Sequence, residues 1–120
     1  METSLRGSVV IIPFPFSDLT GSKRRPALVV ADWGGADVIL AQITSVAHRD
    51  IFAVDLKDRD FSNGALEKES FVRPNKLFTA DKATFLKLVG NLSDEKMKEI
   101  CDIICSVISD NKTSENMLSA

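Results

Sequence analysis

The sequence is poor in the residues that most often carry acid–base or metal chemistry. Its 120 residues include one histidine, His48, and two cysteines, Cys101 and Cys105. A single histidine excludes a mechanism in which two histidines act as general acid and general base. No cysteine and histidine residues have the spacing of a zinc site, and the aspartates are scattered. We therefore expect neither a metal nor a cofactor.

Long apolar runs are also missing. The aliphatic run at residues 9–12 is too short to span a membrane, and residues 1–6 contain no apolar signal segment. We expect a cytoplasmic protein with no membrane contact. A hydrophobic fraction of 44% and a charged fraction of 27% are typical of globular proteins. The length predicts one domain, residues 1–108, followed by a flexible polar tail at residues 109–120.

A strong net charge is the third absence. The net charge is −2 and the pI is about 5.3, which argues against a protein that coats nucleic acid without specificity, because such binding needs many phosphate contacts. The charge is unevenly distributed, however. Residues 1–92 contain 12 Lys and Arg against 11 Asp and Glu, whereas residues 93–120 contain 3 against 6. The first part of the chain can therefore present a local basic site.

The first two thirds of the chain predict short strands separated by turn residues. We expect strands at residues 7–16, 26–30, 37–46, 51–56 and 70–78, with turns at 33–36 and 63–64. Asp81 is placed to cap a short helical turn. Residues 85–92 fit either a further strand or a continuation of that helix.

The last third predicts one amphipathic helix. Ser93 is a suitable N-cap, and Asp94 and Glu95 follow where the helix dipole favours negative charge. The apolar face has helical spacing: Met97, Ile100, Cys101, Ile104, Val107 and Ile108. We expect Cys101 and Cys105 to be buried reduced thiols, with a contact between subunits as the alternative. The whole pattern indicates a mainly β protein, a small β-barrel packed by a C-terminal helix.

A basic run, Lys23, Arg24 and Arg25, precedes Pro26. The residue before a proline is extended, so alternation sends Arg24 and Arg25 to opposite sides of the chain. One of them is then expected to face a groove, where a planar guanidinium is well suited to hold a phosphate. The loop at residues 17–23 contains Gly21 and could close over that groove. A simple solvated loop is the alternative.

Polar residues also end the strand expected at residues 37–46. Gln42 and Thr44 lie on one face and Ser45 on the other. If Thr44 lies beside Arg25, a hydroxyl and a guanidinium converge on one anionic oxygen; otherwise Thr44 is simply a good strand residue. Arg73 precedes Pro74 as Arg25 precedes Pro26, and is either a surface arginine or an RNA contact.

Aromatic residues leave similar alternatives open. Phe14 and Phe16 lie on one side of the first strand, where they fit either the core or base stacking. Trp33, in an expected turn, can serve as a partner contact. His48 fits a solvent-exposed loop position.

Several of these stretches, in the same order, closely resemble the MazF/PemK family of toxin–antitoxin endoribonucleases. The resemblance covers about residues 7–108 and rests on GSVVIIPFPFSD, KRRPALVV, VILAQITS, SFVR, LFTADK and GNLS. It implies an SH3-like β-barrel with a C-terminal helix. It also implies a homodimer that cuts single-stranded RNA without ribosome or metal, and a cognate antitoxin whose acidic segment covers the RNA groove. Family members commonly carry an acidic residue after the first glycine, where this chain has Ser8.

The resemblance maps the family's catalytic arginine and threonine to Arg25 and Thr44. The implied reaction is attack of a ribose 2′-OH on the adjacent phosphodiester, which leaves a 2′,3′-cyclic phosphate and a 5′-OH. The accompanying candidate RNA-binding residues are Lys23, Arg24, Gln42, Ser45, Ser70 and Arg73. Two alternatives stand beside this reading: a catalytically silent barrel that binds RNA or antitoxin, and a poison of a protein target such as a topoisomerase.

Overall fold

The computed structural model describes residues 4–15, 22–46 and 50–110. The predictions for Phe16, Gly21, His48 and most of the tail fall outside these residues. Within them the chain forms seven strands, two short 3-10 helices and one α-helix. Their bounds are β1 (Ser8–Pro15), β2 (Ser22–Ala31), β3 (Asp37–Thr44), β4 (Val54–Leu56), η1 (Asp58–Asp60), β5 (Phe61–Gly64), β6 (Ser70–Asp81), η2 (Lys82–Thr84), β7 (Lys87–Leu92) and α1 (Asp94–Ser109).

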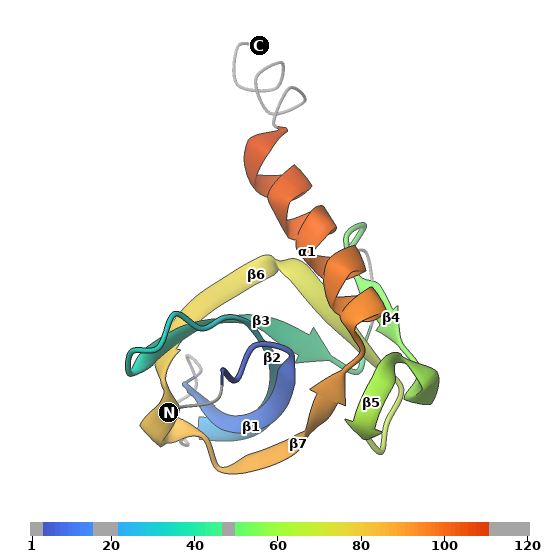
Figure 1. The fold of residues 1–120 in the computed structure, drawn as a ribbon. Helices are drawn as coiled ribbons and strands as arrows, with labels where there is room; N and C mark the ends of the chain where they lie inside the picture. The colour runs from blue at the N-terminus through green and yellow to red at the C-terminus, as the bar shows by residue number, and fades with distance from the viewer. Residues whose placement is uncertain (1–3, 16–21, 47–49, 111–120) are drawn as a thin grey trace.

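The strands form one curled antiparallel sheet in the order β4-β6-β3-β2-β1-β7-β5 (Figure 1). The pairing register shifts at Val9/Val10, Val29/Ala31 and Ala41/Gln42. Such bulges bend strands and increase their twist, so they allow a sheet of this size to curl around a core. The predicted mainly β barrel fold with a C-terminal helix is thus confirmed.

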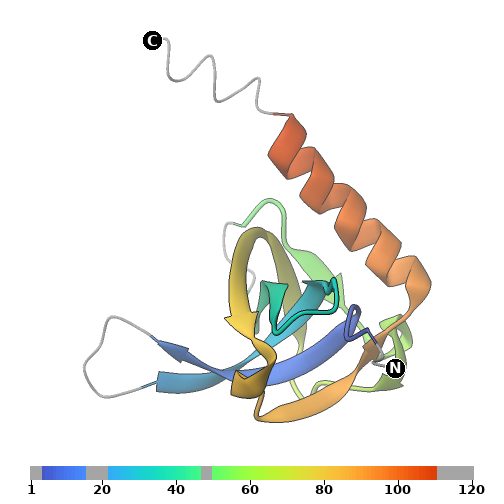
Figure 2. The ribbon, with the colours of Figure 1, turned by 60° about the vertical axis from the view of Figure 1, so that its left-hand side comes forward.

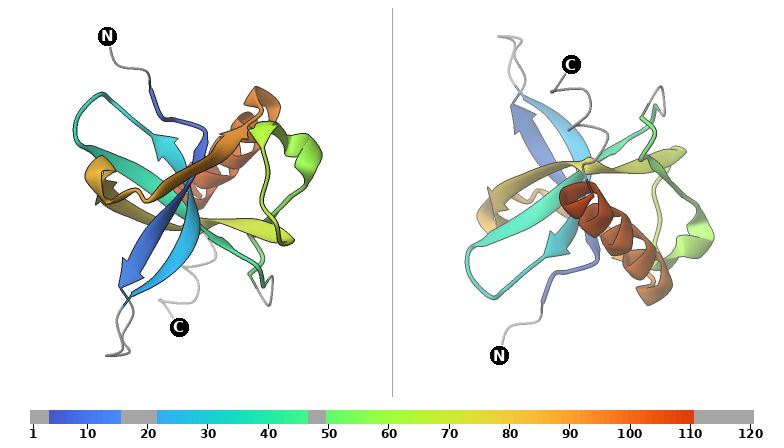
Figure 3. Two further views of the ribbon diagram at one scale, coloured as in Figure 1. Left: turned by 90° about the horizontal axis from the view of Figure 1, so that it is seen from below. Right: turned by 90° about the horizontal axis from the view of Figure 1, so that it is seen from above.

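The prediction that Pro26 opens the second strand is wrong. β2 begins at Ser22, and the basic run is paired with β1 through Pro13↔Arg24 and Ile12↔Arg25. Pairing of β1 with β7 ends at Ile11↔Lys87, so the far part of β1 has β2 as its one neighbour there. Pro13 fits that open edge because it lacks an N–H group. The two strands form an arm that projects away from α1 (Figures 2 and 3).

The predicted turn at residues 63–64 is also wrong, since both residues belong to β5. Gly64 has φ +75°, and a Cβ there would collide with the Val89 carbonyl group on β7. Glycine is therefore required by the close approach of two backbones, not by a reversal of the chain. The segment at residues 85–92 resolves to a strand, β7, and Asp81 caps η2 by accepting a hydrogen bond from the Ala83 N–H (2.8 Å).

Apolar side chains form two clusters of buried residues. The larger one includes Leu28, Ala41 and Val72 from the sheet and Ile100 from the helix. The smaller one includes Val10, Ile12, Ala27, Val29 and Leu40, whose positions alternate with those of the first cluster. Residues 27–30 are buried throughout, as their unbroken apolar run predicted.

The helix begins as predicted and ends beyond the sheet. Ser93 Oγ accepts a hydrogen bond from the Lys96 N–H (3.2 Å), and Met97, Ile100 and Ile104 are buried. Farther along, the expectation of a buried Cys105 is wrong: Cys105 is exposed, and Ile108 is 63% exposed. The physical reason is that the last turns of α1 extend past the edge of the sheet (Figure 2).

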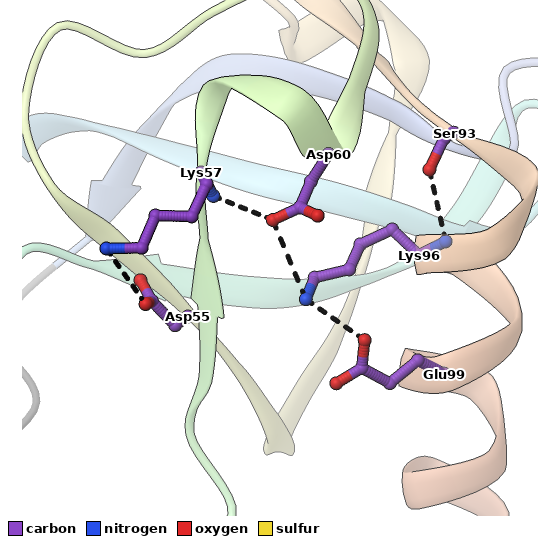
Figure 4. A network of polar contacts seen from close by, with 6 residues as sticks. All are labelled: Asp55, Lys57, Asp60, Ser93, Lys96 and Glu99. Atoms are coloured by element: carbon purple, nitrogen blue, oxygen red, sulfur yellow. Dashed lines mark hydrogen bonds and ion pairs between the residues drawn. The ribbon is translucent and has the colours of Figure 1, made fainter.

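A polar network joins the start of α1 to the β4–β5 connection (Figure 4). Lys96 Nζ lies 3.6 Å from Asp60 Oδ2 and 3.0 Å from Glu99 Oε1. The same Asp60 oxygen accepts a hydrogen bond from the Lys57 N–H (2.7 Å). The Lys57 ammonium, in turn, lies 3.1 Å from Asp55 Oδ2, and this hydrogen-bonded ion pair raises the pKa of Lys57.

A second polar cluster surrounds Asp32, whose side chain is 1% exposed. Its carboxylate accepts hydrogen bonds from the N–H groups of Leu5 (2.7 Å) and Gly34 (3.0 Å), and Lys82 Nζ lies 3.1 Å away. These donors, with the Leu5 N–H the strongest, lower the pKa of Asp32. The cluster joins the N-terminal segment, the β2–β3 turn and η2.

No helix in the described part of the chain has the length and apolar character needed to cross a membrane.

Candidate functional site

The basic run on β2 lines a groove of ≈ 600 Å³, here called the cationic groove. Ile11, Pro26 and Ile43 form part of its apolar surface, and Arg24 shares their side of the sheet by alternation. The predicted RNA-binding residues that line this groove are Lys23, Arg24, Ser45 and Ser70, and Arg25 lines it as well. The structure thus brings together five of the eight predicted site residues.

The opposite side of the groove comes from residues that the sequence analysis did not select as site residues. Lys87 and Val89 of β7 contribute there, as do residues 65–68 between β5 and β6, including Glu67 and Lys68. The link is the β1–β7 ladder, which pairs Ile11 with Lys87. Alternation of Lys87 with the partly buried Val89 was the one local signal, and it is meaningful only once this segment is known to be a strand.

The loop between β5 and β6 is held in place from both sides. Leu66 packs against the larger core cluster. The buried Ser70 donates a hydrogen bond from Oγ to the Lys68 carbonyl oxygen (2.8 Å), and Glu69 lies 3.7 Å from Lys57 Nζ. The Ser70 side chain therefore holds the backbone of this loop. In this way it fixes the positions from which the Glu67 and Lys68 side chains extend.

The cationic groove gathers basic side chains that lack carboxylate partners among the described residues, whereas the other described basic residues without an ion pair, Arg6, Arg59 and Lys76, lie outside it. Lys23, Arg24, Lys68 and Lys87 form no ion pair with any other described residue. The basic side chains that do form ion pairs with described carboxylates lie outside the groove: Lys57, Arg73, Lys82, Lys96 and Lys98. Cations that are gathered without carboxylate partners are the expected footprint of a polyanion site.

By alternation the predicted catalytic residues belong to the other face of the sheet, although Arg25 also lines the cationic groove. Ala27 pairs with Gln42, and Gln42 pairs with Arg73. Arg25 lies two residues before Ala27 on β2, and Thr44 lies two residues after Gln42 on β3. Because the two strands are antiparallel, both residues lie on the same side of the Ala27↔Gln42 pair along the ladder. Alternation therefore places Arg25, Gln42, Thr44 and Arg73 on one face, with Arg25 inside β2 and Thr44 at the end of the neighbouring β3.

Thr44 opens on a second depression of ≈ 470 Å³, here called the Thr44 hollow. Its lining residues are Thr44, Val46, Asp50, Ile51, Phe52, Arg73, Asn75 and Lys76. Arg25 lines the cationic groove instead, and Gln42, which is half-buried, lines neither. The Thr44 hydroxyl is within 3.3 Å of the Val46 carbonyl oxygen and accepts from the Val46 N–H (3.1 Å), so it stays at the strand end.

Arg73 is held inside the hollow by an acidic side chain that sequence reasoning did not select. Its Nε donates a hydrogen bond to Asp50 Oδ2 (2.7 Å), and the Asp50 side chain is 6% exposed. Asp50 and Arg73 are 23 residues apart in the sequence, which explains why no local pattern linked them.

Of the aromatic residues, Phe14 packs on the smaller core cluster, with its ring edge-on to Phe78 (4.9 Å between centroids). Trp33 is 64% exposed in its turn.

Metal ligands are not assembled anywhere in the described residues. No group of three or more histidine, cysteine, aspartate or glutamate side chains there is placed to hold a metal ion. The side chains that line the two depressions include guanidinium, ammonium and hydroxyl groups. These groups bind and stabilise anionic oxygens.

Solved structures of toxins share this fold. An endoribonuclease in complex with its cognate antitoxin, from a mycobacterial species, matches with a TM-score of 0.69 at 19% identity, covering 90% of this chain and 97% of its own. MazF in a MazE–MazF crystal structure from Deinococcus radiodurans matches with 0.68 at 20% identity, covering 85% and 92%. The Mycobacterium tuberculosis toxin MazF-mt6 matches with 0.66 at 16% identity, covering 84% and 95%.

Sequence comparisons give one further match. No curated protein matches the chain. The family model described as "PemK-like, MazF-like toxin of type II toxin-antitoxin system" matches residues 5–108, which include the curled sheet, both depressions and all but the last residue of α1. The chain therefore belongs to the PemK-like, MazF-like toxin family of type II toxin–antitoxin systems.

Proposed function

We propose that this toxin is an endoribonuclease that cuts single-stranded RNA at specific sequences, without ribosome or metal. The observation that carries the proposal is the cationic groove, whose Lys23, Arg24, Lys68 and Lys87 lack carboxylate partners among the described residues. RNA supplies a phosphate at each nucleotide, so one strand can engage cations on both sides of such a groove. The solved toxins of similar fold that are described as endoribonucleases support the reaction class.

The proposed reaction is an internal phosphoryl transfer. The 2′-oxygen of a ribose forms a bond to the adjacent phosphorus, and the bond from phosphorus to the 5′-oxygen breaks. The 2′-hydroxyl loses its proton and the leaving 5′-oxygen gains one, which gives a 2′,3′-cyclic phosphate and a 5′-OH. Negative charge gathers on the non-bridging oxygens in the transition state, and stabilisation of that charge is the main task of the protein.

Arg25 and Thr44 take this task in our proposal. They lie on neighbouring strands and on one face of the sheet, and the guanidinium of Arg25 provides several donors in a fixed plane for the phosphoryl oxygens. Its pKa above about 12 makes it a charge stabiliser and not a proton donor. The Thr44 hydroxyl orients the same phosphate once RNA replaces its contact with Val46.

Partners follow from the same groove. We infer a cognate antitoxin with an acidic segment that competes with RNA for the unpaired cations, in line with the antitoxin-bound toxins of similar fold. We also infer a homodimer that acts in the cytoplasm. A catalytically silent binding barrel is the second candidate, and it is favoured by the separation of Arg25 and Thr44 into two depressions.

The test is cleavage of a long, poorly structured RNA by purified protein in EDTA, with mapping of 5′ ends and their chemistry. Arg25→Ala and Thr44→Ala are compared with Arg59→Ala and Thr79→Ala, which change an exposed arginine and an exposed strand threonine outside both depressions. We expect discrete 5′-OH ends from the wild type and both controls. Loss of one charge-stabilising group slows cleavage by about 10²- to 10³-fold.

Other results separate the alternatives. If folded wild-type protein binds RNA without cutting it, the silent binding barrel replaces the endoribonuclease. Cleavage that Arg25→Ala leaves intact removes Arg25 from the mechanism. A requirement for added divalent metal contradicts the metal-independent reaction.

A further inference from the structure

We propose that the Thr44 hollow is a nucleotide subsite in which Arg73 contacts a phosphate, Phe52 stacks on a base, and Asp50 positions both. The inference rests on the proposed function and names a subsite of the RNA path. The central observation is that the buried carboxylate of Asp50 holds both Arg73, a cation, and the backbone of Phe52, an aromatic residue, beside Thr44. The volume of ≈ 470 Å³ lies within the range of roughly 300–1,000 Å³ usual for small-ligand sites.

Asp50 uses both of its carboxylate oxygens inside the hollow. Oδ2 accepts from Arg73 Nε (2.7 Å), and Oδ1 accepts from the Phe52 N–H (3.0 Å). A buried carboxylate without such donors is unfavourable, so both contacts are held firmly. Asp50 therefore fixes the guanidinium of Arg73 and the turn that presents Phe52, although it contacts no RNA itself.

Arg73 keeps donors for a second anion. A guanidinium carries five N–H groups, and Asp50 occupies the one on Nε. Its side chain is 29% exposed, and Lys76 and Asn75 line the same hollow. A phosphate bound there meets two cations against one buried carboxylate, and Asn75 provides an amide for a base edge or a sugar hydroxyl.

Phe52 supplies the apolar part of the subsite. It is 36% exposed, next to Ile51 at 86%, whereas the other described phenylalanines are only half-buried and not exposed. An exposed ring beside an anchored arginine is the combination that single-stranded nucleic acids engage, with bases on ring faces and phosphates on cations. This neighbourhood favours a nucleotide over an apolar peptide as occupant.

The experiment measures binding separately from cleavage. A fluorescent 2′-O-methyl RNA that contains the mapped cut site cannot be cleaved, so its Kd and salt dependence report binding alone. The variants are Asp50→Asn, Arg73→Ala, the double variant and Phe52→Leu. Asp50→Asn keeps an oxygen to accept from the Phe52 N–H but loses the charge opposite Arg73. The controls are Asp102→Asn, an exposed aspartate paired with Lys98, and Trp33→Leu, an exposed aromatic outside the hollow.

We expect Arg73→Ala to weaken binding about tenfold and to lower the slope of log Kd against log salt by about 0.7, the value for one phosphate of a single strand. Asp50→Asn weakens binding less, and the double variant binds no more weakly than Arg73→Ala, since Asp50 acts on the phosphate through Arg73. Phe52→Leu weakens binding about fivefold or more. This loss disappears when the oligonucleotide has an abasic residue at the stacked position. Both controls bind like the wild type, and thermal unfolding verifies that each variant is folded.

Each contrary result has its own meaning. Tighter binding by Asp50→Asn would show that Asp50 competes with RNA and overturn its positioning role. Wild-type affinity in folded Asp50→Asn, Arg73→Ala and Phe52→Leu, with cleavage intact in the wild type, would reject the subsite and leave the endoribonuclease standing. If Phe52→Leu lowers self-association or antitoxin binding but not RNA affinity, the hollow is a protein contact. If the wild type neither binds nor cuts RNA, both proposals fail.

Discussion

Basic side chains at the two ends of this molecule are treated in opposite ways. Around the start of α1, Lys96 lies between Asp60 and Glu99 (Figure 4), and Lys57 lies between Asp55 and Glu69. Along the cationic groove, the described partners of Lys23, Arg24, Lys68 and Lys87 include no carboxylate. Near the start of α1, ion pairs connect elements of the fold to one another. Along the groove, the cations remain available to bind an external anion.

The difference teaches where stability and binding can be separated. Unpaired cations repel one another and contribute little to folding, so their removal leaves the folded state intact or slightly more stable. The contacts of Lys96 with Asp60 and Glu99 involve no residue that lines the groove, whereas the Lys57–Glu69 pair holds the loop that does. We therefore expect changes in α1 and changes of groove cations to act separately, and variants that affect both would break the comparison.

The largest effect is expected from the core beneath α1. Ile100 is 0% exposed, so Ile100→Ala removes buried methyl groups and leaves a cavity. We expect the free energy of unfolding to fall by about 2–5 kcal/mol, measured by urea denaturation. RNA affinity of the remaining folded protein stays at the wild-type level. A loss of affinity at temperatures where the variant is fully folded would show that the helix end shapes the groove.

Next in size is the removal of groove cations. Arg24→Ala and Lys87→Ala each remove one cation that lines the groove, and with it one proposed phosphate contact. Each is expected to weaken RNA binding about fivefold and to lower the salt slope by about 0.7, additively in the double variant. Fluorescence anisotropy across a salt series measures both quantities, and unfolding midpoints stay within error. A full effect from Arg24 with none from Lys87 would confine RNA to the β1–β2 arm.

A smaller effect is expected at the helix cap. Ser93→Ala removes the hydrogen bond that the side chain accepts from the Lys96 N–H (3.2 Å). The loss of an N-cap costs about 0.5–2 kcal/mol of stability. Ser93→Asp keeps an acceptor and should restore most of it. If Ser93→Ala is as stable as the wild type, the Asp60 and Glu99 contacts of Lys96 alone fix the start of α1.

How well the sequence predicted each part depended on how local the determining contacts are. The helix start at Ser93, the capped turn at Asp81 and the buried run at residues 27–30 follow from neighbouring residues, and all were predicted correctly. The start of β2 was missed because three adjacent cations resemble a loop. The backbone hydrogen bonds that make Arg24 and Arg25 part of a strand come from β1, on the far side of residues 16–21 in the sequence.

The candidate site divides in the same way. Arg25, Thr44 and Arg73 carry local signals, a following proline or the end of a polar strand face. Lys87 and Asp50 do not, because their importance arises from partners far away in the sequence, Ile11 in one case and Arg73 in the other. The exposure of Cys105 likewise depends on where the sheet ends beneath α1, which no helical periodicity records.

The Asp32 cluster is expected to make the free energy of unfolding depend on pH, and only at acidic pH. The Leu5 and Gly34 N–H groups and Lys82 lower the pKa of Asp32 from its ordinary value of 3.8. The ionised form is thus favoured by folding. Its stabilising contribution is fully present above pH 3.8 and is lost as the pH falls through the lowered pKa of the folded state. Urea unfolding of the wild type should weaken more steeply below pH 4 than that of Asp32→Asn. Parallel pH profiles would contradict this assignment.

The smallest effect is expected where a charge pair is fully exposed. Lys98 and Asp102 lie four residues apart on α1, 3.0 Å between Nζ and Oδ2, with side chains 77% and 67% exposed. Such pairs contribute about 0.3–0.5 kcal/mol and are screened by salt. Lys98→Ala should therefore lower the unfolding free energy by no more than that, and by less in 1 M salt. Because Lys98 lies outside both depressions, the variant also tests whether groove position or mere positive charge governs RNA binding. An RNA affinity reduced as strongly as in Lys87→Ala would mean that net charge alone drives binding, and the contrast between paired and unpaired cations would lose its functional meaning.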